Sequence, residues 1–112
     1  MQGLTEKMKK LATWAGRSEF TYEGSVTTGT TIHYGSNFST TVSANKYAAL
    51  LKRFKGLEVN IGTSRDRAPE DSVGDWLQKN VTLTAIASYV GAILIDEGYA
   101  KKGVQKATIK FC

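Results

Sequence analysis

The sequence predicts an α+β fold, a mainly antiparallel sheet with helices packed on one face, in a single domain over residues 1–112. Consecutive segments between residues 19 and 42 alternate apolar and polar side chains, which is typical of half-buried strands. Other segments space their apolar residues three and four positions apart, as amphipathic helices do. Hydrophobic residues make up 41% of the chain, which is enough for one core and excludes the compositions of disordered and fibrous proteins.

A first helix is expected over residues 3–15. Its apolar side chains recur with helical spacing, at Leu4, Met8, Leu11 and Ala15. Gly16 follows as a stop, because glycine tolerates the left-handed conformation of a C-terminal cap. The period then becomes alternating, and three strands fit the segment up to residue 42, with breaks at Gly24-Ser25 and Gly35-Ser36-Asn37. These strands predict an antiparallel meander with threonines on its wetter face.

A second helix runs from a cap at Ser43 to a stop at Gly56 and has the clearest pattern in the chain. Its apolar face consists of Tyr47, Leu50, Leu51 and Phe54. Residues 57–61 predict a fourth strand, since apolar and polar side chains alternate there. Residues 62–71 are polar and contain the only proline, so we expect an exposed, mobile loop.

Two further helices and a last strand are expected in the C-terminal third. Ser72 caps a short helix, and Thr82 or Thr84 caps the next one. The segment over residues 83–97 is apolar almost all round, so we expect a helix buried at the centre of the domain. Its expected core residues include Leu83, Ile86, Val90 and Leu94. Alternation over residues 107–111 predicts the last strand, and the expected order is αβββαβααβ.

The chain is basic, with 15 Lys and Arg against 10 Asp and Glu and a net charge of +5. This balance favours an anionic partner such as nucleic acid. Cys112 is the only cysteine, so we expect no intrachain disulfide and a reducing compartment. No secretory signal and no apolar segment of about 20 residues is present, which predicts a cytoplasmic protein without a membrane anchor.

Residues suited to catalysis are few. His33 is the only histidine, and we expect a partly exposed strand residue there. The short motifs of phosphate loops, dinucleotide sites, metalloproteases and serine hydrolases are missing. Acidic residues gather in and after the loop among arginines and a lysine, which leaves open whether they bind a metal; they are Asp66, Glu70, Asp71 and Asp75. No catalytic residue, metal site or cofactor is therefore predicted, and we expect a non-enzymatic protein.

The basic residues fall into groups on the first helix, the second helix, the loop and the C-terminal strand. If these groups meet on one surface, they contact the phosphates of nucleic acid, and Trp14 or Tyr34 is available to stack on a base. The C-terminal group comprises Lys101, Lys102, Lys106 and Lys110. The candidate nucleic-acid-binding residues are Lys46, Lys52, Arg53, Lys55, Arg65 and Arg67.

Two element orders are similar to those of nucleic-acid-binding modules. The αβββα order over residues 3–55 resembles a double-stranded-RNA-binding domain, although Thr40-Thr41-Val42-Ser43 stands in place of its glycine-rich turn and lysine pair. A helix, the Gly98-Tyr99 break and a lysine-rich strand resemble the end of a winged-helix module. We expect no helix-turn-helix before it, because residues 83–97 leave no room for a separate turn.

The alternative is a protein-binding or homodimerising module, such as an adaptor or inhibitor. Its partner would touch the loop over residues 62–71 or pair with an exposed sheet edge. Lysines on the last strand oppose unspecific edge pairing. Salt distinguishes the two functions, since phosphate contacts weaken steeply as salt rises.

Overall fold

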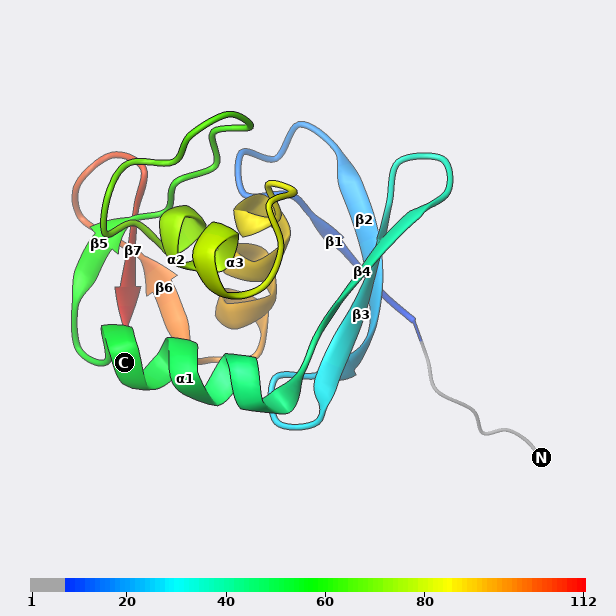
Figure 1. Ribbon diagram of the computed structural model, residues 1–112, viewed down its shortest axis with the longest axis horizontal. Coiled ribbons are helices and arrows are strands. Elements are labelled where there is room, and N and C mark those ends of the chain that lie inside the picture. The colour runs from blue at the N-terminus through cyan, green and yellow to red at the C-terminus, as the bar shows by residue number, and fades with distance from the viewer. Residues whose placement is uncertain (1–7) are drawn as a thin grey trace.

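The computed structural model describes residues 8–112, in which three helices pack with two antiparallel sheets (Figure 1). The larger sheet has the order β1-β2-β3-β4, and the smaller has the order β5-β7-β6. The strands are β1 (Lys9–Ala12), β2 (Glu19–Ser25), β3 (Gly29–Tyr34), β4 (Phe38–Val42), β5 (Glu58–Asn60), β6 (Ala100–Lys102) and β7 (Thr108–Phe111). The helices are α1 (Ala44–Phe54), α2 (Val73–Asn80) and α3 (Ala87–Asp96). The α+β class is confirmed.

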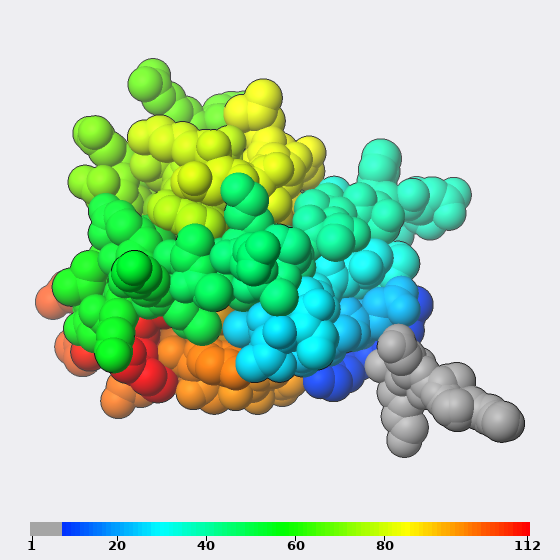
Figure 2. Space-filling view, turned by 60° about the horizontal axis from the view of Figure 1, so that its bottom comes forward, coloured from blue at the N-terminus to red at the C-terminus, as the bar shows by residue number. Residues whose placement is uncertain are grey.

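The predicted meander forms the larger sheet. Its inner face buries Phe20, Tyr22, Ile32 and Val42. Thr31 lies opposite Thr41 on the other face, as the alternation predicts. The break between β2 and β3 falls at residues 26–28, slightly later than expected. The β3–β4 hairpin extends beyond the core and projects from the body of the molecule (Figure 2).

The expected helix over residues 3–15 is wrong where the structure describes it. Residues Lys9–Ala12 form β1, which pairs with β2 and places Leu11 opposite Phe20. Met8 belongs to the supposed apolar stripe but is 51% exposed. Pairing with β2 satisfies the backbone groups of this short segment, which tertiary contacts can favour over helical spacing. The remainder of the prediction, residues 1–7, lies outside the described residues.

The prediction of α1 is confirmed. The Ser43 hydroxyl accepts from the backbone N–H of Lys46 at 3.2 Å, so it caps the helix. Tyr47, Leu50 and Phe54 are buried, and the hydroxyls of Tyr47 and Thr30 lie 2.7 Å apart. This helix is thereby attached to β3 of the larger sheet.

Between α2 and α3 the prediction is only partly correct. Ser72 caps α2 by accepting from Asp75 N–H at 3.0 Å. However, α3 begins at Ala87, with Ile86 as its N-cap and no side-chain cap. Residues 81–86 form a separate turn, and Leu83 is 83% exposed there, so its assignment to the core is wrong. Because the N–H groups of residues 81 and 82 both bond to the Leu77 carbonyl, α2 ends before the apolar segment begins.

The helix α3 lies between the two sheets, not on one face of a single sheet. The Trp14 N–H donates to the Ser88 carbonyl at 3.0 Å, which joins the end of β1 to α3. Gly91 lets Ile61 and Trp14 pack closely against α3, because a Cβ there would lie 2.7 Å from Ile61 Cδ1 and 2.9 Å from Trp14 Cε3. Val90 and Leu94 are buried, as predicted. The strand β6, which the sequence did not predict, follows α3 and gives the order ββββαβααββ.

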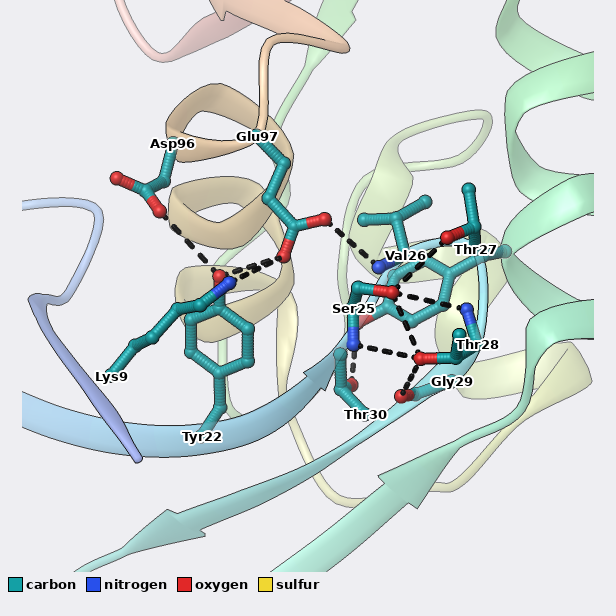
Figure 3. Close-up of polar contacts among 11 residues, drawn as sticks. Lys9, Tyr22, Ser25, Val26, Thr27, Thr28, Gly29, Thr30, Asp96 and Glu97 are labelled. Carbon is teal, nitrogen blue, oxygen red and sulfur yellow. Dashed lines mark hydrogen bonds and ion pairs between the residues drawn. The ribbon is translucent and has the colours of Figure 1, made fainter. Parts of the chain in front are cut away.

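A polar cluster fastens the C-terminal end of α3 to the larger sheet (Figure 3). The Tyr22 hydroxyl donates to Glu97 Oε2 at 2.7 Å, and the Val26 N–H donates to Glu97 Oε1 at 3.0 Å. Lys9 Nζ lies 3.7 Å from the same carboxylate. Burial is the main cause that raises the pKa of the Tyr22 phenol far above its usual value, and the hydrogen bond to Glu97 is the second cause.

Candidate nucleic-acid interface

The predicted binding residues are divided between α1 and the loop over residues 62–71. All six side chains are exposed. In Figure 1, α1 runs along the lower edge, whereas the loop over residues 62–71, which carries Arg65 and Arg67, arches over the upper edge. Within α1, Lys46 lies in the first turn, and Lys52 lies in the last turn. The structure therefore separates Lys46, Lys52 and Lys55 from Arg65 and Arg67, whereas Arg53 contacts the end of the loop at Asp71.

The end of α1 lies beside the C-terminal hairpin. Lys52 and Lys55 line a hollow of about 370 Å³, whose other walls include Tyr99, Phe111 and Cys112. Phe111 stacks on Phe54 with ring centroids 5.4 Å apart, which fixes β7 against α1. The C-terminal segment (red) lies against the segment of α1 (green) in Figure 2. Aromatic packing thus places the α1 lysines beside the end of β7, the strand that carries Lys110.

Lysines of the hairpin complete a basic surface. Lys101 of β6 lies directly opposite Lys110 of β7. Lys110 Nζ donates to the Gly56 carbonyl at 3.0 Å, just beyond α1. We name this surface the lysine face, and it consists of Lys52, Lys55, Lys101 and Lys110.

Glu58 is the acidic residue paired with this surface, since it lies opposite Lys110 in β5. Its carboxylate accepts from the backbone N–H of Gln105 at 3.0 Å and from the Thr108 hydroxyl at 2.8 Å. These two hydrogen bonds hold the pKa of Glu58 below its usual value, and the Lys110 charge acts in the same direction. The carboxylate is therefore ionised at neutral pH and engaged by the β6–β7 turn, and the lysine face keeps a positive excess.

The predicted arginines have other neighbours. Arg53 Nη2 lies 3.4 Å from Asp71 Oδ1, and its guanidinium lies 4.8 Å from the Phe54 ring centroid. The Lys79 ammonium, the Asp71 N–H and the Arg67 charge hold the pKa of Asp75 below its usual value. Arg53 and Arg67 therefore belong to a mixed-charge region around α2 and contribute little positive excess.

The acidic residues around α2 are engaged with basic side chains. Asp75 Oδ2 lies 3.1 Å from Lys79 Nζ and accepts from the Asp71 N–H at 3.2 Å. Within residues 8–112, no group of three or more His, Cys, Asp or Glu side chains is placed to hold a metal ion. His33 Nε2 lies 2.9 Å from Glu23 Oε2 on the larger sheet. Over the same residues, no helix has the length and apolar character needed to cross a bilayer.

The turn at residues 81–86 gives α2 and α3 the sequence of a helix-turn-helix, which was not expected. In such modules the second helix enters the major groove. Here α3 is covered by Trp14 at Gly91, and the Tyr34 ring stacks on Tyr89 at 4.8 Å. A helix covered in this way has no free face for base contacts, and α3 contains no Lys or Arg to contact phosphates.

Sequence reasoning found Lys52 and Lys55, but it did not select Lys101 and Lys110. Both were visible as a lysine group on the C-terminal strand. Their pairing depends on the register between β6 and β7, and β6 was not predicted. Alternation of lysines with Ile109 and Phe111 was the available signal.

Comparison of the chain with models of protein families, with curated proteins and with solved structures finds no match.

Proposed function

We propose that the chain binds nucleic acid through phosphate contacts at the lysine face. The observation that carries this function is the arrangement of Lys101 directly opposite Lys110, whose ammonium reaches the Gly56 carbonyl just beyond the α1 lysines Lys52 and Lys55. Like charges that face each other across two strands repel and destabilise the pair. Phosphate groups add to the compensation that Glu58 gives Lys110, and the release of their counterions supplies much of the binding free energy.

The geometry favours docking without base recognition. Lys52, Lys55 and Lys101 are exposed, and their ammonium groups act as point charges, whereas Lys110 is half-buried and its ammonium donates to backbone carbonyls. Phosphate contacts of this kind position a partner but carry no sequence information. The function we propose is therefore electrostatic docking on a phosphate backbone, with no catalytic step.

The test measures binding of fluorescent duplex DNA, single-stranded DNA and double-stranded RNA at two salt concentrations. The double variant Lys52→Ala/Lys101→Ala removes two of the lysines without touching the Lys110 hydrogen bond. We expect its affinity to fall at least tenfold and the slope of log K against log salt to decrease by about 2. Its unfolding temperature should stay close to that of the unmodified protein, because both side chains are exposed.

The matched control is Arg17→Ala/Lys46→Ala, which removes the same charge outside the lysine face. Its affinity should change less than threefold, reflecting net charge alone. Equal losses in the two double variants would contradict the lysine face as the binding site. No binding to any of the nucleic acids, or a complex that salt does not weaken, would overturn the proposed function and favour a protein partner.

A further inference from the structure

Three aromatic rings form a column at the end of the larger sheet. Tyr34 closes β3, Phe38 opens β4, and Tyr89 belongs to α3. The Tyr34 and Tyr89 ring centroids lie 4.8 Å apart at 21°, and those of Tyr34 and Phe38 lie 6.0 Å apart at 18°. Phe20 meets Tyr89 edge-on at 5.1 Å. The column therefore leads from the core to Phe38, which is 64% exposed.

Local structure holds the exposed ring in place. Tyr34 and Phe38 are directly opposite each other at the end of the β3–β4 hairpin. Gly35 has a φ of 61°, and a Cβ there would lie 3.0 Å from Phe38 Cδ2, so the ring lies close against the turn. The hydroxyls of Tyr34 and Thr40 lie 3.0 Å apart, which orients the Tyr34 ring. An exposed aromatic ring whose position is fixed loses little entropy when a planar ligand stacks on it.

Polar groups surround the column. A hollow of about 470 Å³ has both rings of the hairpin in its wall. The same wall carries hydrogen-bonding side chains, among them Lys10, Thr21, His33, Asn37 and Ser39. This volume falls in the range of small-ligand sites, and apart from the aromatic rings the wall is mainly polar.

Positive charge lies nearby as well. Lys10, in the wall of the hollow, supplies this charge, and its Nζ lies 3.5 Å from Glu19 Oε1. Aromatic faces combined with cationic and hydrogen-bonding side chains are characteristic of sites that bind unpaired bases.

We propose that Phe38 and Tyr34 form a stacking site for an unpaired base of a single-stranded nucleic acid. This inference rests on the proposed function and adds a preference for single strands. A base inside a duplex is stacked on both faces and cannot reach Phe38, whereas a base in a single strand can continue the column. The lysine face contacts phosphates in either form, so the stacking site is what distinguishes them.

The test compares Phe38→Leu with the unmodified protein, using a fluorescent 12-nucleotide single strand and a duplex of equal length. We expect the single-strand affinity to fall about tenfold and the duplex affinity to stay unchanged, since one base stack contributes about 1–3 kcal/mol. Leu83→Ser is the matched control, because it removes another exposed apolar side chain outside the column. A second variant, Phe38→Trp, should retain binding and show quenched tryptophan fluorescence with the single strand.

Each outcome separates this inference from the proposed function. If Phe38→Leu binds the single strand normally while Lys52→Ala/Lys101→Ala weakens both nucleic acids, the stacking site is wrong and the lysine face stands. If Phe38→Leu weakens the single strand while the lysine variant does not, the stacking site stands alone. Quenching of Phe38→Trp by a neutral oligosaccharide but not by the oligonucleotide would overturn the inference in favour of a sugar site. Absence of binding to both nucleic acids would overturn both proposals.

Discussion

Glu97 shows how one side chain can join distant parts of a chain. Its two carboxylate oxygens accept from Tyr22 and Val26, which are more than 70 positions away in the sequence. The side chain is only 13% exposed, so water replaces these bonds poorly. The cluster therefore fixes the end of α3 against the β2–β3 turn.

We expect Glu97→Ala to lower the free energy of unfolding by about 1–3 kcal/mol, because the Val26 N–H and the Tyr22 hydroxyl lose their acceptor. Urea unfolding followed by circular dichroism measures the change. Glu19→Ala is the control, since Glu19 forms an exposed pair with Lys10 that contributes about 1 kcal/mol or less. Equal effects of the two substitutions would show that the buried contacts of Glu97 add nothing to stability.

The central element is α3, because it packs between both sheets. Val90 and Leu94 are fully buried, whereas Leu83 lies in the exposed turn before the helix. We expect Val90→Asp and Leu94→Asp to abolish cooperative unfolding, since a buried unpaired carboxylate costs as much as the stability of a small domain. Leu83→Asp should shift the urea midpoint very little. Circular dichroism and gel filtration of the three variants check this, and a folded Val90→Asp monomer would contradict the assignment of α3 to the core.

Elements with agreeing local signals could be predicted from the sequence. In α1, a cap at Ser43, an apolar face through Tyr47 and Phe54 and a stop at Gly56 all indicate one helix. In residues 9–12 the local signals do not indicate a strand, because β1 forms only through its pairing with β2. The sequence did not indicate the turn at residues 81–86, because this turn forms part of an apolar segment. Its start is set by the backbone hydrogen bonds that end α2 at the Leu77 carbonyl.

The candidate site required information that no single segment contains. Lys52 and Lys55 stood out on their helix, but their neighbours Lys101 and Lys110 are set by strand register and by the stacking of Phe54 on Phe111. The stacking column likewise combines Tyr34 with Tyr89 from a distant helix. Tyr34 was recognised in the sequence as available for stacking, whereas Phe38 was not.

At the scale of the whole molecule, two buried tyrosines link stability to alkaline pH. Burial raises the pKa of Tyr47 from 10.0 to about 12, and burial also raises the pKa of Tyr22. In an unfolded chain both phenols ionise near pH 10. Because the pKa of each phenol is higher in the folded state, the stabilising contribution of its proton is fully present below pH 10. This contribution is lost as the pH rises toward 12.

We therefore expect the free energy of unfolding to be nearly constant from pH 7 to 9 and to fall steeply between pH 10 and 12. Urea unfolding at each pH measures this dependence. Tyr47→Phe should fall less steeply over the same range, because one of the titrating groups is gone. An identical slope in the variant would show that the Tyr47 phenol does not contribute to alkaline unfolding.

The position of β7 at the centre of its sheet governs the order in which the protein can assemble during synthesis. The meander joins strands that follow one another closely, so it can pair while translation continues. In contrast, β5 leaves the ribosome about 50 residues before its neighbour β7. Until β7 follows, the backbone N–H and C=O groups of β5 that bond to β7 stay unpaired. A nascent chain arrested before residue 108 would thus hold a paired meander next to an open, aggregation-prone half.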